Sequence, residues 1–195
     1  MRTGIFGGAF NPPHLGHLIV AECARSALSL DRVVWIPGND PPHKPTPSAV
    51  AADRLRMVEL AIASNEHFVA SADEIERGGV SYTVDTLEEM ASERDDLYLI
   101  MGADSLVSFE GWYRPSRILE LATLAAYPRA GVGDINARTR LTGEAVILDA
   151  PIIAISSTAI RERVSAGTSI RYLVPDAVAE FIRTRSLYKT TSLNK

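Results

Sequence analysis

Residues 7–17 read Gly7-Gly8-Ala9-Phe10-Asn11-Pro12-Pro13-His14-Leu15-Gly16-His17, and they decide how the fold begins. Before this stretch, residues 2–6 form a short apolar segment typical of a buried strand. After it, residues 16–29 carry apolar side chains at helical spacing. Adjacent glycines let the backbone approach a ligand closely, and the start of a helix points free N–H groups at an anion. The stretch therefore predicts a strand, a phosphate-binding turn and a helix.

The remainder of the chain continues this alternation of strand and helix. We expect strands at residues 33–36, 68–70, 97–101, 124–127, 146–148 and 152–155, and helices at 51–64, 83–93, 116–121 and from about 158 and 176. This order favours an α/β fold with a Rossmann-like, mostly parallel sheet and helices on both faces. A length of 195 residues fits a single domain, residues 1–195, with the C-terminal helical part from about 157 packed on the sheet. In the first helix, we expect the inner face to consist of Ile19, Val20, Cys23, Ala27 and Leu30.

Composition and charge exclude several classes of protein. The net charge is −4, which argues against a nucleic-acid polymer as ligand, because binding to a phosphate backbone needs an extended basic surface. The sequence has no apolar run of membrane-spanning length and no signal-peptide pattern at Met1, so we expect a cytoplasmic protein without a membrane partner. Cys23 is the only cysteine, which excludes an internal disulfide and a cysteine-based zinc site. A homo-oligomer is left open.

His14 and His17 are the candidate catalytic residues. They lie three positions apart at the start of a predicted helix, so both rings can face one bound group. An imidazole donates a hydrogen bond to a phosphate oxygen and can stabilise charge that develops during phosphoryl-type transfer. The alternative is a surface histidine pair that caps a turn. The stretch lacks the patterns of a Walker A loop and of a dinucleotide fingerprint, which indicates another nucleotide chemistry.

A second segment joins predicted strand 152–155 to Ser156, Ser157 and Thr158. Serine and threonine are preferred caps at the start of a helix, and that structural role alone would explain them. Arg161, however, places a cation at the positive end of the helix dipole, against the usual preference. A bound anion removes this conflict, so the segment predicts a polyphosphate site.

Together, residues 7–17 and Ile155-Ser156-Ser157-Thr158-Ala159-Ile160-Arg161 resemble the H-x-G-H and I-S-S-T-x-I-R signatures of the nucleotidyltransferase superfamily. Within it, the chain is most similar to bacterial nicotinate-nucleotide adenylyltransferases. The segments 82–87, 102–104 and 112–113 also resemble the acceptor-site segments of that family. Asn11 departs from the pattern, because many members have aspartate there, and Pro13 stands at a variable position.

The resemblance implies transfer of AMP from ATP to the phosphate of nicotinic acid mononucleotide. Pyrophosphate then leaves with Mg²⁺, which is held through the ATP phosphates and not by protein side chains. His17 would bind the α-phosphate and His14 the phosphates beside it. The ATP site implied by the resemblance comprises Gly7, Gly8, Ala9, Phe10, His14, His17, Ser156, Ser157, Thr158 and Arg161.

The acceptor site implied by the resemblance comprises Lys44, Tyr82, Thr83, Thr86, Gly102, Asp104, Trp112 and Tyr113. Trp112 and Tyr113 would stack on the pyridine ring, although ordinary packing is the alternative for both. Lys44 can equally be a solvated surface lysine, and Asp104 can be a simple helix cap.

Three rival functions remain at this point. A related transferase could adenylylate phosphopantetheine or transfer CMP, but segments 82–87 and 102–104 argue against it. A class I aminoacyl-tRNA synthetase also uses an H-x-G-H loop, but 195 residues leave no room for tRNA-binding domains. A nucleotide-binding sensor without catalytic activity would have no need of both histidines and Arg161. Release of pyrophosphate from ATP distinguishes the enzyme from the sensor.

Overall fold

The fold is built on one parallel sheet. The computed structural model describes residues 1–39, 48–91, 95–129 and 145–189. Six strands pair in the order β3-β2-β1-β4-β5-β6, and every pairing is parallel. The predicted α/β, Rossmann-like fold is confirmed. The strands are β1 (Arg2–Gly8), β2 (Arg32–Pro37), β3 (Phe68–Ala70), β4 (Asp96–Gly102), β5 (Ala122–Tyr127) and β6 (Val146–Ile147).

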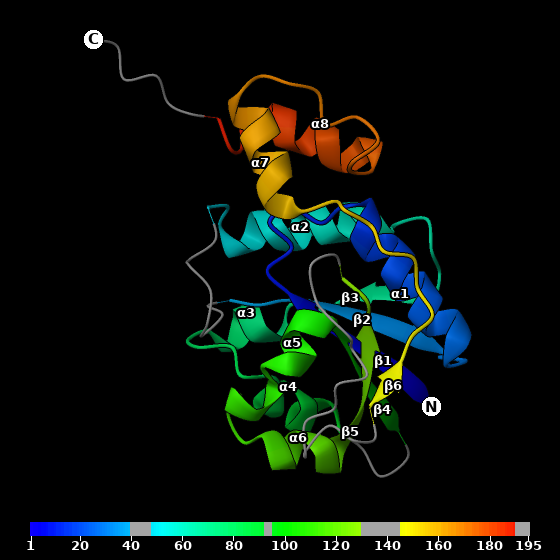
Figure 1. The fold of residues 1–195 in the computed structure, drawn as a ribbon. Helices are drawn as coiled ribbons and strands as arrows, with labels where there is room; N and C mark the ends of the chain where they lie inside the picture. Colours follow the sequence, from blue (N-terminus) through cyan, green and yellow to red (C-terminus); the bar gives the residue numbers. More distant parts are fainter. Residues whose placement is uncertain (40–47, 92–94, 130–144, 190–195) are drawn as a thin grey trace.

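Helices cover both faces of the sheet (Figure 1). On one face, α1 and α2 pack against β1 and β2, and α7 and α8 lie beyond α2. On the other face, α4, α5, η1 and α6 enclose a second apolar cluster. The helices are α1 (Leu15–Ala27), α2 (Ala51–Ile62), α3 (Asp73–Arg77), α4 (Thr83–Met90), α5 (Ala103–Val107), η1 (Phe109–Gly111), α6 (Pro115–Leu121), α7 (Ser157–Ser165) and α8 (Asp176–Thr184).

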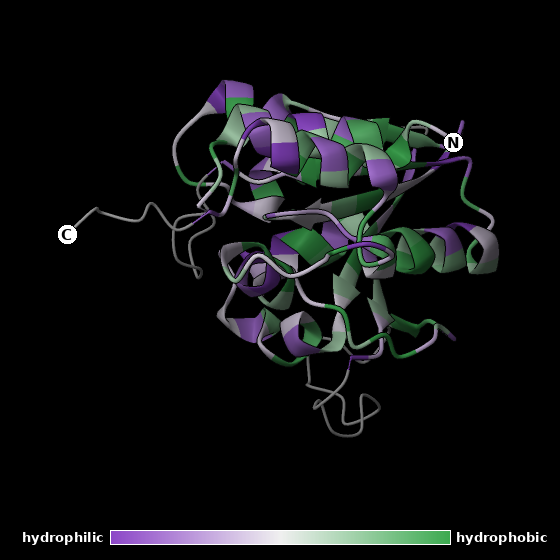
Figure 2. Cartoon of the chain, turned by 90° about the horizontal axis from the view of Figure 1, so that it is seen from above, coloured by the Kyte–Doolittle hydropathy of each residue, from purple (hydrophilic) through white to green (hydrophobic). Residues whose placement is uncertain are grey.

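The buried stripe of α1 differs from the one expected. Gly16, Val20 and Ala24, spaced four residues apart, are buried together with Ala21, whereas Ile19 is 40% exposed. The small residues let α1 lie close to the sheet, so the helix is rotated away from the expected face. Figure 2 shows how hydrophobic and hydrophilic residues alternate along these covering helices. None of the helices in the described ranges has the length and hydrophobicity needed to cross a membrane.

The C-terminal helical part packs on a helix and not directly on the sheet. Helix α8 packs against α2, and Arg185 donates to Asp53 of α2 over 3.1 Å. Val178 and Ile182 of α8 are buried in the same cluster as the inner residues of α2. Through α2, this part joins the apolar cluster on that face of the sheet, one layer further out.

Residues 152–155 were predicted to form a strand, and this prediction is wrong. The segment pairs with no strand in the described part of the chain. Ile152 is 62% exposed, while Ile155 packs against the cluster on the α1 side of the sheet. Four apolar residues in a row fit a buried strand, but they fit an extended connection that runs over the core equally well.

The topology places two loops side by side. Strands β1 and β4 are neighbours, and the chain leaves β1 for a helix on one face and β4 for a helix on the other. In parallel sheets of this kind, ligands bind beyond the carboxyl ends of the strands where the connections diverge. Gly8 and Gly102 end these two strands, so the predicted site residues lie at this position.

Candidate active site

The loop after β1, residues 7–14, is named here the glycine loop. Gly7 is exposed, and a Cβ added there would have no other atom within 4 Å. A Cβ added to Gly8 would lie 3.1 Å from the ring of Phe10. Phe10 itself has a φ of 44°, in the left-handed region that bulky residues rarely adopt. The loop is therefore open to solvent at Gly7 and closely packed at Gly8 and Phe10.

His14 and His17 share one orientation at the start of α1. His14 is the N-cap of the helix, and its ring stacks on that of His17 with centroids 3.6 Å apart. The backbone N–H of His14 donates to Nδ1 of His17 over 3.2 Å. Because Nδ1 accepts this bond, a neutral His17 carries its proton on Nε2. The Nε2 atom of His17 is therefore a hydrogen-bond donor.

His14 is uncharged at neutral pH. Its side chain is buried, and burial, assisted by the positive charge of Arg129, lowers its pKa from 6.5 to about 4. Its Nδ1 is buried without a partner in the described part of the chain. Gly16 leaves room for the ring, because a Cβ there would lie 3.0 Å from that nitrogen. A glycine is thus required at the centre of the H-x-G-H pattern.

The segment of residues 155–161, named here the serine motif, is bound directly to the glycine loop. The Ser157 hydroxyl donates to the carbonyl of Pro12 over 2.8 Å, and Arg161 donates to the carbonyl of Asn11 over 2.9 Å. The Ser156 hydroxyl caps α7 by accepting from the N–H of Ala159 over 3.1 Å. The fold therefore joins the two motifs that the sequence separates by more than a hundred residues.

The remaining donors of the serine motif surround the start of α7. Arg161 also donates to the Thr158 hydroxyl over 3.1 Å, and Thr158 is exposed. Both Ser156 and Ser157 already have partners within the protein, so their hydroxyls have a structural role besides any ligand contact. Thr158 and Arg161 are the side chains of this motif best placed to meet a polyphosphate.

The aromatic residues of the predicted acceptor site form two separate pairs. The rings of Tyr82 and Tyr113 lie 4.5 Å apart, and Tyr113 is 52% exposed. Trp112 is partly buried and contacts Phe109, with centroids 5.6 Å apart. Tyr82, with Thr83 beside it, lies at the start of α4, which has no side-chain cap. The structure therefore brings Tyr113 to the positive end of α4. Trp112 instead packs against Phe109 of η1 and the apolar cluster beneath it.

Thr86 does not offer its hydroxyl to a ligand in this structure. The side chain is buried; its hydroxyl donates to Glu74 over 2.7 Å and accepts from Arg77 over 2.9 Å. The Thr86 hydroxyl is therefore occupied within the protein, and a contact between Thr86 and the acceptor stays a prediction. Its position, one turn into α4, faces the interior of the domain. Lys44 lies outside the described residues.

Asp104 follows β4 and forms an ion pair with Arg129, Oδ2 to Nη1, over 3.0 Å. Both side chains are about half exposed, so the pair lies at the surface of the site. A Cβ added to Gly102 would come within 2.7 Å of each of them, which explains the glycine there. Asp104 is not the N-cap of α5, a position that Gly102 occupies, but lies in the first turn of this helix.

Three residues of this region were missed from the sequence. Arg129 lies just beyond β5, and its charge reaches His14. Tyr188 donates its hydroxyl to Oδ1 of Asn11 over 2.8 Å, across 177 positions of sequence. Arg54 donates to the carbonyl of Ala9 over 3.0 Å. Only Arg54 had a local signal: it lies three and four residues before Met57 and Val58, on the buried stripe of α2.

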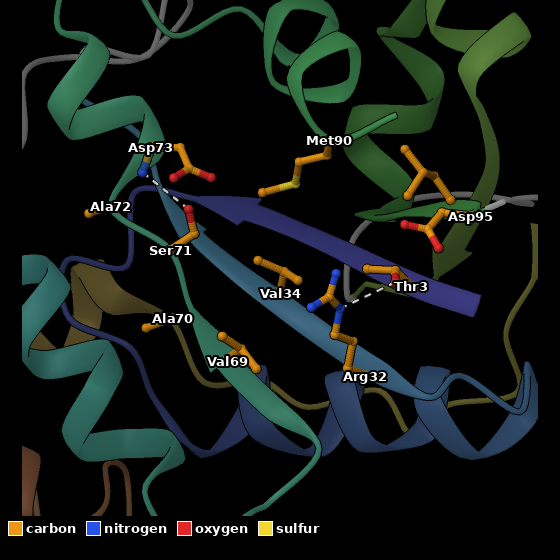
Figure 3. A pocket seen from close by; sticks show the side chains of 11 residues that line it. Thr3, Arg32, Val34, Val69, Ala70, Ser71, Ala72, Asp73, Met90 and Asp95 are labelled. Carbon is orange, nitrogen blue, oxygen red and sulfur yellow. Dashed lines mark hydrogen bonds between the residues drawn. The ribbon is translucent and has the colours of Figure 1, made fainter. Parts of the chain in front are cut away.

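A separate cavity of about 330 Å³ lies at the other end of the strands (Figure 3). Thr3, Arg32 and Leu97, near the starts of β1, β2 and β4, contribute to its walls. Arg32 donates to Thr3 over 3.4 Å, and Asp95, which also lines the cavity, binds the N-terminal amine. Because phosphate sites of this fold lie at the carboxyl ends, this cavity is not the candidate active site.

Metal binding by side chains finds no support in the described ranges. They contain no group of three or more His, Cys, Asp or Glu residues that could hold a metal ion. Asp104, the carboxylate of the site, is already paired with Arg129.

Comparison with known proteins identifies the family. The model of the cytidylyltransferase-like family matches residues 5–163. A protein of Salinibacter ruber named probable nicotinate-nucleotide adenylyltransferase is 44% identical over 98% of this chain and 100% of its own length. A Synechococcus protein of the same name is 45% identical, over 96% of this chain and 94% of its own.

A solved structure, the Plasmodium falciparum nicotinic acid mononucleotide adenylyltransferase complexed with NaAD, superposes with a TM-score of 0.79 at 15% identity. The superposition covers 96% of this chain and 97% of that one. At this identity the likeness shows the fold alone. From the family match and the full-length relatives, the chain belongs to the cytidylyltransferase-like family, among the relatives named nicotinate-nucleotide adenylyltransferases.

Proposed function

We propose that this chain transfers the adenylyl group of ATP to nicotinic acid mononucleotide, giving nicotinic acid adenine dinucleotide and pyrophosphate. One observation carries the proposal. The glycine loop and the serine motif, two phosphate-binding segments from opposite ends of the chain, are held together by Ser157 and Arg161. Relatives of matching length and 44–45% identity bear the name of this activity. We place the activity in the cytoplasm, as a step of NAD biosynthesis.

The reaction is a direct displacement at the α-phosphorus of ATP. An oxygen of the acceptor phosphate forms the new P–O bond, the bond to the β-phosphate breaks, and pyrophosphate leaves. The protein contributes position and charge, and no side chain forms a covalent intermediate. Mg²⁺ carried on the ATP phosphates would neutralise the charge of the leaving group.

His17 is proposed to act on the α-phosphate. Its Nε2 carries the proton, because Nδ1 accepts from the backbone of His14. A donor fixed in this way stabilises the negative charge that builds up on the phosphate oxygens in the transition state. His14, uncharged at neutral pH, would donate a hydrogen bond to a neighbouring phosphate, while Thr158 and Arg161 would bind the β- and γ-phosphates.

The pyridine carboxylate of the acceptor is assigned to the start of α4. The helix presents its positive end there without a side-chain cap, beside the rings of Tyr82 and Tyr113. Such a site accepts a carboxylate well. A carboxamide would bring its own N–H donors against backbone donors, and each buried unpaired donor costs about 1–3 kcal/mol.

The test is an assay with ATP, Mg²⁺ and either nicotinic acid mononucleotide or nicotinamide mononucleotide. We expect catalytic efficiency to be roughly 5- to 150-fold higher with the acid. Equal efficiencies, or a preference for the amide, would contradict the assignment of the acid but leave adenylyl transfer intact. Phosphopantetheine, supplied in parallel, should not be adenylylated. A chain that binds ATP but releases no pyrophosphate with any acceptor would instead be a nucleotide sensor.

A further inference from the structure

Arg54 is a buried cation whose partners in the described ranges are backbone carbonyls. Its side chain is 1% exposed. The guanidinium donates to the carbonyls of Ala49 over 3.2 Å, Ala9 over 3.0 Å and Asn39 over 3.2 Å. It forms no ion pair within the described residues, and the neighbouring Asp53 is bound by Arg185. Burying an uncompensated charge is costly, and an apolar side chain would hold α2 in place without this cost.

The bond to Ala9 controls the conformation of the next residue. The Ala9 carbonyl and the N–H of Phe10 belong to one planar peptide group and point in opposite directions. With the carbonyl held by Arg54, the Phe10 N–H points away from the guanidinium, and it makes no hydrogen bond within the described residues. Phe10 also has the unfavourable φ of 44°. A bulky residue keeps such a conformation only where its surroundings fix it.

The ring of Phe10 contacts His17, so the position of Phe10 affects that of the histidine. The ring is buried, and its centroid lies 5.2 Å from that of His17 in an edge-on arrangement. Any shift of the Ala9–Phe10 peptide would therefore move the Phe10 ring, against which the His17 ring packs. Arg54 does not itself contact either histidine in the described structure.

The bond to Asn39 extends the same support to the acceptor side. The Asn39 N–H donates to the Ser81 hydroxyl over 2.9 Å, and its side chain donates to the Gly79 carbonyl over 3.0 Å. Ser81 directly precedes Tyr82, the N-cap of α4. One guanidinium thus connects the loop assigned to ATP with the segment that leads into the acceptor helix.

We propose that Arg54 is a positioning residue for adenylyl transfer, which sets the glycine loop and the segment before α4 relative to each other from inside the domain. The inference relies on the proposed function for the reaction, but the hold on the two loops does not depend on which acceptor is used. Its effect should appear mainly in turnover, because both substrates can still bind to loops that are slightly misplaced.

The test compares Arg54→Lys and Arg54→Met with two controls on the same helix. Val58→Ala removes buried apolar atoms of α2 but leaves the three hydrogen bonds of Arg54 in place, and Arg56→Met removes an exposed cation. Turnover at saturating ATP and acceptor is measured well below each unfolding temperature. We expect Arg54→Lys, which retains the charge but not the planar fork of donors, to lose about 10- to 100-fold in turnover. The KM values should change less, and Val58→Ala should lose stability only.

Two further measurements separate positioning from a general structural role. Amide hydrogen exchange of residues 7–14 and 79–83 should accelerate in Arg54→Lys but not in Val58→Ala. In the His17→Ala background, Arg54→Lys should cost much less turnover than in the wild type, because both changes affect the same contact. Turnover of Arg54→Lys equal to that of Val58→Ala, or unchanged exchange in both segments, would overturn the proposal. A wild-type chain that is inactive on ATP and nicotinic acid mononucleotide counts against the proposed function, whereas the exchange measurement still decides the role of Arg54.

Discussion

The rings of His14 and His17 stack with their centroids 3.6 Å apart, and only one of the two is deeply buried. Two imidazolium ions cannot share this distance without strong repulsion. The low pKa of His14 resolves the conflict, since this ring stays neutral over the physiological range. The His14 ring therefore adds no positive charge beside His17 at neutral pH.

His17→Ala should lower turnover by about 10²-fold or more, with a smaller effect on ATP affinity, because the lost donor acts on charge that develops in the transition state. Steady-state kinetics with ATP and nicotinic acid mononucleotide measure both parameters. His67→Ala, a partly buried histidine outside the site, is the control for a general effect of losing an imidazole. Turnover like that of the wild type in folded His17→Ala would remove His17 from the chemistry.

The stability of the protein should fall as the pH falls from 6.5 toward 4 because of His14. Its folded pKa is about 4, so in this window the unfolded chain takes up a proton that the folded chain rejects. Between pH 7 and 5, this linkage amounts to about 2 kcal/mol at most. The measurement is urea unfolding of wild type and His14→Asn at both pH values. The wild type should lose more free energy of unfolding than the variant, and parallel losses would contradict the buried neutral ring.

Arg161→Ala should raise the KM for ATP by roughly 30-fold, with a smaller change for the acceptor, since a charged hydrogen bond in a closed site is worth about 2 kcal/mol. The variant also loses the hydrogen bond that Arg161 donates to the Asn11 carbonyl in the glycine loop. Arg163→Ala serves as control, because the side chain of this exposed residue of the same helix donates to the Ser169 carbonyl and not to the glycine loop in the part of the chain described. An unchanged KM for ATP, with only the acceptor affected, would move Arg161 to the other half of the site.

Tyr188→Phe should destabilise the fold by about 1–2 kcal/mol, because it leaves Oδ1 of the buried Asn11 without its donor. Burial also raises the pKa of Tyr188, so its hydroxyl remains a donor at all moderate pH values. The free energy of unfolding in urea measures the effect. Tyr172→Phe, at a residue 72% exposed, should leave it unchanged. A similar small change in both variants would show that the bond to Asn11 contributes little.

Periodicity and motif spacing were enough to predict the parallel sheet and most of its helices. Residues 68–70, for example, form a strand at the predicted positions. The failure at residues 152–155 is instructive, because hydrophobicity records burial but not hydrogen bonding to a neighbouring strand. The short helices α3 and α5, each of five residues, carry too few positions for a periodic signal.

The sequence allows a prediction of site residues where they belong to a short motif, but not where a contact depends on distant partners. His14, His17 and Arg161 belong to contiguous patterns. Tyr188 gives no such signal, since its role exists only through contact with Asn11 at the other end of the chain. Thr86 belongs to a predicted segment, but the bond from its hydroxyl to Glu74, twelve residues earlier, has no signal in the motif.

The bond between Tyr188 and Asn11 also has a consequence for synthesis on the ribosome. The glycine loop is translated well before the residues that fix it, which are Ser157, Arg161 and Tyr188. A nascent chain can form β1 and α1 early, but it cannot complete the nucleotide site. Catalytic competence should therefore arise only after residues 157–188 have emerged and docked on the glycine loop.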